Sequence, residues 1–279
     1  MAVVTERVAD QRDTAPEFAL IAKDVLKAFL SREKAVRAVD GISLAVRRRE
    51  IYGLLGANGS GKSTLLRLLA ALLAADSGEI SVFGRDLKAE EMAVKRLVNR
   101  VAVDASFFKK LSALENLVYA GRMYGVPPTL CRGRAKKVLE RVGIAEKRHD
   151  EALENLSRGM QQKVAIARSL LTSPALVLLD EPTAGLDIRS KREVQAFIRE
   201  LRAEHDATIV LATHDLEEAE RLSDRIGIVE RGRLVGEGTV VELLAEASAS
   251  TLEEAFMSLT AVGVDDGDES DEGTKARAS

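Results

Sequence analysis

The sequence carries Gly56-Ala57-Asn58-Gly59-Ser60-Gly61-Lys62-Ser63-Thr64, which matches the pattern G-x-x-x-x-G-K-[ST]. An apolar run at 51–55 precedes this stretch, and residues 62–74 follow with leucines at helical spacing. Glycines let the backbone curl, so that its N–H groups and the start of the helix point at phosphate oxygens. The stretch therefore predicts a phosphate-binding loop between a strand and a helix. The alternative, a Gly-rich structural turn, leaves the lysine unexplained.

The side chains after the last glycine are expected to make the specific contacts of this loop. Lys62 is expected to reach the β- and γ-phosphates of ATP, Ser63 to place its hydroxyl on Mg²⁺, and Thr64 to donate on the α-phosphate side. The remaining nucleotide contacts are predicted for Gly56, Asn58, Gly59, Ser60 and Gly61.

Strand and helix patterns surround the loop on both sides. Short strands with a turn at Asp40-Gly41 indicate an antiparallel edge sheet before it, and alternation of strands with helices after residue 156 favours a parallel sheet covered by helices. The predicted strands are 18–28, 35–46, 51–55, 79–83, 175–179, 208–212 and 225–230.

The middle of the chain is predicted to be mostly helical. Its periodicity indicates an inserted helical subdomain at about 89–171. We therefore predict an α/β fold, a P-loop NTPase core with an antiparallel β subdomain and an inserted α-helical subdomain. The predicted helices are 62–74, 90–99, 113–124, 131–142, 160–171, 188–203 and 251–260.

Two predicted buried strands end in polar residues where open α/β sheets present ligands. Asp180 can hold Mg²⁺ through its water shell, and Glu181 can accept a proton from the water that attacks the γ-phosphate. His214 follows the strand at 208–212 and is positioned to hydrogen-bond the γ-phosphate, whereas His149 and His205 are interpreted as surface residues. A solvated strand end is the alternative for the acidic pair. The predicted catalytic residues are Glu181, His214 and Lys62.

The formal net charge of −3 is distributed unevenly. Residues 263–279 hold six acids against two bases, so this segment carries −4 and the rest is close to +1. Neither part has the excess of positive charge that is typical of nucleic-acid-binding proteins, so we expect no nucleic-acid partner. We predict a disordered N-terminal segment at 1–17, one domain at 18–262 and a disordered acidic tail at 263–279. No signal peptide or membrane span is expected, and the single Cys131 fits a reducing compartment.

Two further stretches make the chain resemble the ATP-binding subunits of ABC transporters. Residues 156–163 resemble the ABC signature, and residues 180–187 resemble the family's second acidic motif and D-loop, in the expected order and spacing. The resemblance implies that two nucleotide-binding domains sandwich two ATP molecules. It assigns Ser157 and Gly159, with exposed backbone at Gly159, to the partner's nucleotide, and Asp187 to the interface. Phe29 is placed like the adenine-stacking aromatic, with core packing as the alternative.

The chain departs from the family pattern in the Q-loop. The expected glutamine is missing, since Val103 occupies its position, and Asp104 is the next residue. We expect Asp104 to substitute as a ligand of Mg²⁺ or water. Its added negative charge near the γ-phosphate would slow or alter hydrolysis. An ATP-binding regulatory module with little turnover is therefore one alternative function.

The resemblance implies a membrane partner. It predicts an integral membrane permease, docked around 105–110 with Phe107 and Phe108 as apolar contacts, at the cytoplasmic face of the cell membrane. The last helix resembles that of ATPases paired with ABC-2-type permeases, and the chain has no room for the regulatory β-domain of many importers, so export is favoured. A soluble ABC ATPase acting on ribosomes or DNA is the other alternative.

Overall fold

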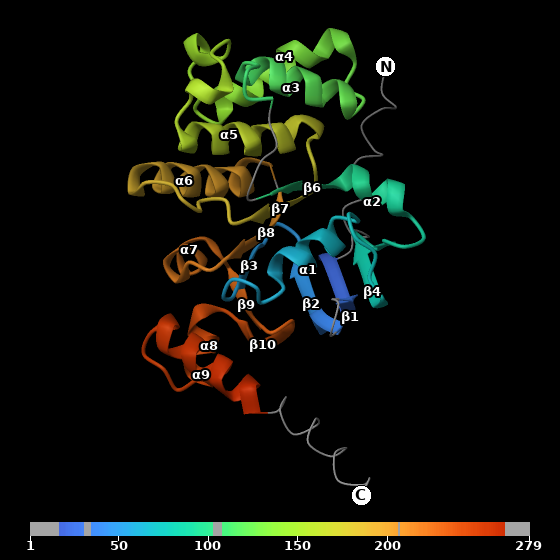
Figure 1. The fold of residues 1–279 in the computed structure, drawn as a ribbon, viewed down its shortest axis with the longest axis vertical. Coiled ribbons are helices and arrows are strands. Elements are labelled where there is room, and N and C mark those ends of the chain that lie inside the picture. The colour runs from blue at the N-terminus through green and yellow to red at the C-terminus, as the bar shows by residue number, and fades with distance from the viewer. Residues whose placement is uncertain (1–16, 31–34, 103–107, 206, 266–279) are drawn as a thin grey trace, which may run out of the picture.

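The computed structural model describes residues 17–30, 35–102, 108–205 and 207–265, which form two β-sheets with helices around them (Figure 1). The smaller sheet is antiparallel throughout, with strand order β2-β1-β4-β5. This result confirms the predicted antiparallel subdomain. The predicted turn at Asp40-Gly41 is wrong, because one strand runs through both residues with only a shift of register there. Its strands are β1 (Phe18–Leu30), β2 (Ala35–Arg47), β4 (Ser77–Val82) and β5 (Arg85–Asp86).

The larger sheet has the order β10-β9-β3-β8-β7-β6 and is parallel except for the antiparallel hairpin β9–β10. Every residue of β3, β7 and β8 is buried, as expected for strands covered on both faces. Parallel strands end at one edge of the sheet, so the residues after these three strands meet there. The strands are β3 (Ile51–Leu55), β6 (Val98–Val101), β7 (Leu176–Asp180), β8 (Thr208–Thr213), β9 (Arg225–Glu230) and β10 (Arg233–Gly238).

Helix α1 (Lys62–Leu69) lies between the two sheets, in contact with β2, β7 and β8. Its four leucines from Leu65 to Leu69 are fully buried in one apolar cluster with residues of both sheets. The helix is shorter than the predicted 62–74, because the backbone turns at Ala71, whose φ is +53°. Leu72, predicted as part of the helical pattern, is exposed beyond this turn.

A predicted helix at 90–99 is wrong in its final residues. Helix α2 (Glu91–Leu97) ends one residue before Val98, which has extended backbone angles and begins β6. The strand β6 then pairs in parallel with β7, at the edge of the larger sheet. Part of the segment predicted as a helical insert therefore belongs to the core sheet.

Helices α3, α4 and α5 lie together at one end of the molecule, beyond α6 (Figure 1). Helix α3 begins with a capping box between Ser112 and Glu115, and α4 begins with Pro128 at its first position, which explains its start before the predicted residue 131. The helices are α3 (Ala113–Met123), α4 (Pro128–Arg141), α5 (Arg158–Ser169) and α6 (Ile188–His205), with short 3-10 helices at Glu146–Arg148, Leu153–Asn155 and Leu170–Thr172.

Helices α8 (Val240–Glu246) and α9 (Leu252–Asp265) lie at the opposite end (Figure 1), where α9 packs on β9 and β10. Helix α7 (Leu216–Leu222) lies nearer the middle of the molecule, in contact with α6, β3 and β8. Because α9 continues to Asp265, positions 263–265 are helical rather than part of the predicted tail. Among the described helices, none combines the length and apolar character needed to cross a membrane.

Candidate nucleotide site

The predicted phosphate loop leaves β3 and enters α1 through glycines that other residues cannot replace. Gly61, the N-cap of α1, has φ +107°, and a Cβ there would lie 2.1 Å from the carbonyl oxygen of Ala38. A Cβ at Gly56 would lie 2.3 Å from the carbonyl oxygen of Val229. No side chain caps α1 and its first turn contains no acid, so its N-terminal N–H groups remain available to an anion.

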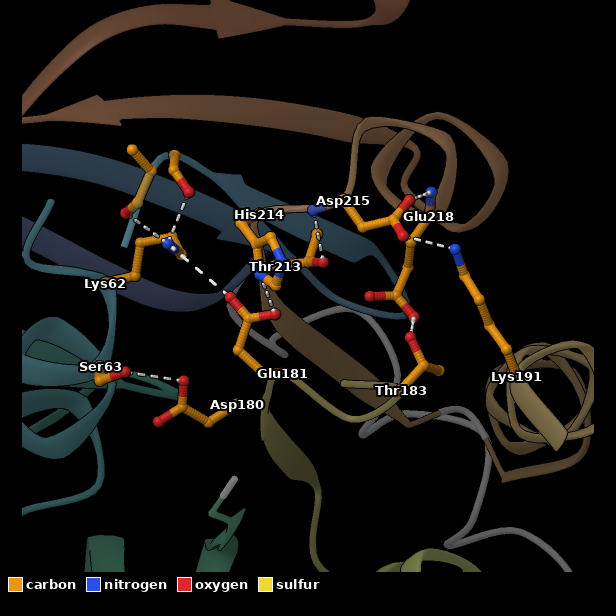
Figure 2. A network of polar contacts seen from close by, with 12 residues as sticks. Lys62, Ser63, Asp180, Glu181, Thr183, Lys191, Thr213, His214, Asp215 and Glu218 are labelled. Carbon is orange, nitrogen blue, oxygen red and sulfur yellow. Dashed lines mark hydrogen bonds and ion pairs between the residues drawn. The ribbon is translucent and has the colours of Figure 1, made fainter. Parts of the chain in front are cut away.

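The side chain of Lys62 is held in place by carbonyl oxygens of the phosphate loop. Its buried Nζ donates to the carbonyl oxygens of Gly56 at 2.7 Å and Ala57 at 3.0 Å, and lies 3.8 Å from Oε1 of Glu181 (Figure 2). Burial lowers the pKa of the Lys62 ammonium, while the charges of Glu181 and Asp180 oppose that decrease. The lysine is therefore positioned before any phosphate is bound.

Ser63 and Asp180 meet between α1 and the end of β7. The Ser63 hydroxyl donates to Oδ1 of Asp180 at 2.9 Å, and the Asp180 side chain is only 1% exposed (Figure 2). A hydroxyl and a carboxylate side by side are hard oxygen donors, and Mg²⁺ sites in nucleotide-binding proteins use such pairs together with substrate oxygens and water. These residues fit the predicted metal ligands Ser63 and Asp180.

Arg100 is a residue of this site that the sequence prediction missed. It lies on β6, next to β7, and its Nη2 is 2.5 Å from Oδ2 of Asp180. The segment was predicted to be helical up to residue 99, so nothing placed Arg100 beside the end of β7. The sequence feature that could have indicated a strand here is the pair of valines around Arg100. Val98 and Val101 are both buried in the structure.

Glu181 and His214 face one another at the ends of β7 and β8. Nδ1 of His214 is 2.8 Å from Oε2 of Glu181, so the imidazole N–H donates to the carboxylate (Figure 2). Glu181 has φ +49°, a left-handed conformation that costs energy for a residue other than glycine and directs its side chain toward Lys62. Both residues contribute to one pocket.

This pocket of about 390 Å³ is formed by the phosphate loop and the two strand ends. The buried Ser60 hydroxyl has no hydrogen-bond partner among the described residues, as expected for a group that awaits a ligand. The structure therefore brings together most of the predicted catalytic and nucleotide-binding residues. The pocket is lined by Ala38, Asn58, Gly59, Ser60, Gly61, Lys62, Ser63, Thr64, Glu181, Ala184 and His214.

A second polar network extends from this pocket toward α6 and α7. The Thr183 hydroxyl donates to the buried carboxyl of Glu218 at 2.6 Å, and Lys191 on α6 forms an ion pair with Asp215, the N-cap of α7 (Figure 2). Burial raises the pKa of Glu218, and hydrogen bonds from Thr183 and Thr213 only partly offset this shift. Glu218 was not identified from the sequence, because a glutamate on a helix ordinarily faces solvent.

The predicted signature and D-loop residues do not line the pocket of their own chain. Ser157 caps α5 and is exposed, but Gly159 is buried against α6, where a Cβ would lie 2.6 Å from Ser190 Cβ. The expectation of exposed backbone at Gly159 is therefore wrong. Asp187 caps α6, accepting from the backbone N–H groups of Arg189 and Ser190.

The remaining predicted residues have different outcomes. Phe29 is 39% exposed with Lys27 Nζ 5.8 Å from its ring centre, so the alternative of core packing is wrong. Phe108 is exposed and meets Tyr119 edge to face. Asp104, Val103 and Phe107 lie outside the described residues.

The interpretation of His149 as a surface residue is wrong. His149 is 1% exposed, and its Nε2 donates to the carbonyl oxygen of Ile144 at 2.9 Å. A main-chain hydrogen bond also links it to α3, because its carbonyl oxygen accepts from the N–H of Leu114. The side chain of His205 lies outside what the structure describes.

Comparisons with known proteins show the family to which this chain belongs. The family model described as "ABC transporter" matches residues 39–184. The chain is 38% identical over 240 residues to the daunorubicin/doxorubicin resistance ATP-binding protein DrrA of Streptomyces peucetius, covering 86% of this chain and 71% of that protein. The linearmycin resistance ATP-binding protein LnrL of Bacillus subtilis is 35% identical, with coverage of 82% and 71%.

Import proteins and a solved structure are similar as well. The methionine import ATP-binding protein MetN of Rhizobium johnstonii is 39% identical over 216 residues, covering 76% of this chain and 59% of that protein. A dimeric structure of the ATP-binding cassette MJ0796 in a post-hydrolysis state, bound to ADP and Pi, is similar with a TM-score of 0.72 and 27% identity, covering 79% and 98% of the two chains.

Proposed function

Because this chain belongs to the ABC transporter family and is the ATP-hydrolysing subunit of such a transporter, we propose that the pocket at the carboxyl edge of its larger sheet is the MgATP site. One observation carries this proposal. At the phosphate loop, Lys62 and Ser63 from the start of α1 converge with Asp180, Glu181 and His214 from the ends of β7 and β8.

The loop binds the triphosphate of ATP. Its backbone N–H groups and the start of α1 provide a concave, electropositive surface, and the buried ammonium of Lys62 reaches the β- and γ-phosphates. Thr64 donates on the α-phosphate side. Phe29 stacks on the adenine, which its exposure permits. The nucleotide contacts are assigned to Gly56, Asn58, Gly59, Ser60, Gly61, Lys62, Ser63 and Thr64.

The hydroxyl of Ser63 and the carboxylate of Asp180 hold the Mg²⁺ of MgATP, with Asp104 as a further ligand in the predicted Q-loop. The metal supplies neutralisation of the charge that develops on the phosphates. Glu181 accepts the proton of the attacking water, since its carboxylate opens into the pocket. His214 donates to Glu181 through Nδ1, which fixes the orientation of that carboxylate.

A second nucleotide-binding subunit completes each site. In the proposed dimer, Ser157 and the start of α5 face the partner's γ-phosphate, and Asp187 lies at the interface. Ser157 is exposed at a helix N-terminus, which suits an anion-binding role across an interface. Gly159 then acts within its own chain, by letting α5 approach α6. The dimeric state of the similar MJ0796 structure supports this arrangement.

The subunit drives an integral membrane permease from the cytoplasmic face of the cell membrane. Export is favoured by similarity to two proteins named for antibiotic resistance, DrrA and LnrL. Import is the second candidate, because the methionine import protein MetN is equally similar in identity. Phe108, which belongs to the predicted docking segment 105–110, and Tyr119, whose ring it meets, are both exposed and offer apolar contact to the permease.

The direction of transport is tested in proteoliposomes. The chain is purified with the membrane protein that binds it and is reconstituted into vesicles. MgATP is added outside only, so that ATP is hydrolysed only by complexes whose ATP-binding subunit lies on the outer face. An exporter concentrates its cargo inside the vesicles, and an importer depletes it. Glu181→Gln complexes serve as the matched control without hydrolysis. Purification with ribosomes or DNA instead of a membrane protein would contradict the transporter assignment and support the soluble alternative.

A further inference from the structure

The carboxylate of Asp180 has two partners, one on each oxygen. Oδ1 accepts from Ser63, and Oδ2 lies 2.5 Å from Nη2 of Arg100. Arg100 is paired in register with Leu178 on β7, two residues before Asp180, so adjacent strands present the two charged groups at the same edge of the sheet.

Arg100 is itself largely enclosed. Its side chain is 16% exposed, and its Nε is buried with no hydrogen-bond acceptor among the described residues. A guanidinium keeps its charge at all physiological pH values and offers five donors, so this group is a permanent cation beside the Asp180 carboxylate. The orphaned Nε is a donor still available to a further acceptor.

We propose that Arg100 is a positioning residue of the nucleotide site that makes ATP binding less dependent on a divalent cation. It fixes Asp180 with Oδ1 turned toward Ser63, and it adds a positive charge beside the phosphates. This inference rests on the proposed MgATP site, because it requires Ser63 and Asp180 to be the metal side of that site.

The sign of the effect follows from the charges. Without metal, Asp180 and Glu181 repel the phosphates of ATP, and Arg100 offsets the charge of Asp180. With metal, the same guanidinium repels the cation and competes for the Asp180 carboxylate. At an effective dielectric of about 20, unit charges several ångströms apart alter an equilibrium by about tenfold or more. Removing the charge of Arg100 therefore weakens metal-free binding and strengthens metal-dependent binding.

A purely structural ion pair would give a different result. If Arg100 only stabilised the end of β7, its replacement would lower the unfolding midpoint and leave the metal dependence of nucleotide binding unchanged. The chain offers a matched control in Arg225, whose guanidinium is also enclosed and pairs with the carboxylates of Glu50 and Glu237. The carboxylate of Asp180 pairs with Ser63 and Arg100 rather than with any of these three residues, and none of the three lines the nucleotide pocket.

The test compares two dissociation constants of the non-hydrolysable analogue adenylyl imidodiphosphate, one with excess EDTA and one with excess Mg²⁺. The ratio of the constant in EDTA to the constant in Mg²⁺ is measured by calorimetry for the full wild-type chain and for Arg100→Gln, Arg100→Lys and Arg225→Gln. We expect Arg100→Gln to raise the ratio by about tenfold or more. Arg100→Lys keeps the charge and is expected to stay within about threefold of wild type, and Arg225→Gln is expected to leave the ratio unchanged.

Three outcomes overturn the proposal: an unchanged ratio in folded Arg100→Gln, a rise in Arg100→Lys equal to that in Arg100→Gln, or an equal rise in Arg225→Gln. A ratio of one in both the wild type and Arg100→Gln, by contrast, contradicts the proposed metal site itself. If Arg100→Gln fails to fold, Asp180→Asn is compared with the double variant Arg100→Gln/Asp180→Asn. The double variant removes both charges of the ion pair and so leaves neither of them buried and unpaired. The double variant must then bind the analogue in EDTA about tenfold more weakly than Asp180→Asn, and equal binding overturns the proposal.

Discussion

The carboxylate of Glu181 is held between two groups that reach it from different directions. Its Oε2 accepts from Nδ1 of His214 at 2.8 Å, and its Oε1 lies 3.8 Å from Nζ of Lys62. The side chain is mostly enclosed, yet it forms part of the pocket wall. A carboxylate fixed in this way at the phosphate pocket is placed to accept a proton from a bound water.

Glu181→Gln is therefore expected to abolish turnover and spare binding. The amide is nearly isosteric but cannot accept the proton, so we expect phosphate release to fall by about 10²- to 10⁴-fold. ATP affinity is expected to change little. The control is Glu217→Gln, an exposed glutamate paired with Arg221. A Glu181→Gln protein that releases phosphate at a rate close to wild type would remove Glu181 from the mechanism.

His214→Ala tests the positioning of that carboxylate. Loss of the Nδ1 donor frees Glu181 to rotate, so we expect kcat to fall by about 10- to 100-fold with a small change in KM. The side chain is 48% exposed, and its removal should leave the unfolding midpoint near that of wild type. Steady-state phosphate release and urea unfolding on the same preparation measure both effects. An unchanged kcat would contradict the role given to the imidazole.

His149→Ala is expected to show the opposite pattern. The ring is buried, hydrogen-bonded to the carbonyl of Ile144, and not part of the pocket lining. Its loss leaves a buried acceptor unsatisfied and a cavity, which costs about 1–3 kcal/mol of unfolding free energy. ATP affinity is expected to be retained. Urea unfolding measures the loss of stability, and nucleotide titration measures the ATP affinity. A variant as stable as the wild type would contradict this account.

Gly159→Ala is expected to destabilise the packing of α5 on α6. The added methyl would approach Ser190 to 2.6 Å, and overpacking of this kind costs about 1–3 kcal/mol. The change Ser190→Gly removes the obstructing side chain, so the double variant should lose less stability than the two single changes together.

The control for this pair is Gly133→Ala in α4. An added Cβ there meets nothing within 4 Å, so this variant should gain roughly 0.5–1 kcal/mol through better helix propensity. Additive losses in the Gly159 and Ser190 cycle, measured by urea unfolding, would rule out the proposed contact.

Glu218→Gln is expected to change how stability depends on pH. Because burial raises the pKa of Glu218 above its usual 4.5, the folded protein holds this proton more tightly than the unfolded chain does. The associated stability is fully present below pH 4.5 and is lost as pH rises through the folded pKa. Glutamine cannot titrate and retains an oxygen to accept from Thr183.

The two proteins are compared by urea unfolding at several pH values between 4 and 7. The stability of the wild type relative to Glu218→Gln should decline as pH increases. A constant difference across this range would show that the carboxyl titrates in the folded protein as it does in the unfolded chain.

The phosphate loop and the strand ends were predictable because each is a local pattern. The fold around Gly56 to Thr64, the two sheets and the meeting of Asp180, Glu181 and His214 all follow from apolar runs that end in polar residues. Edge strand β6 was not predictable in the same way. Val98 to Val101 has only four residues and continues a helical periodicity, and its pairing with distant β7 decides its conformation.

Residues that serve contacts between distant segments were also missed. His149 has polar neighbours in the sequence, and only the packing against α3 encloses it. In the sequence, Gly159 looks like a glycine that exposes its backbone to a ligand. In the structure, a glycine is needed there because Ser190 on α6 lies too close for a side chain. Arg100 acquires its partner through the same edge strand that the sequence pattern concealed.

The order of strands in the larger sheet has a consequence for the newly translated chain. Ser63 leaves the ribosome early, but its partner Asp180 is 117 positions later, and β8 must be inserted between β3 and β7 before the two can meet. A nascent polypeptide that still lacks β8 therefore holds a phosphate loop without its acidic residues in place. Unfinished copies of the subunit are expected to consume no ATP during their synthesis.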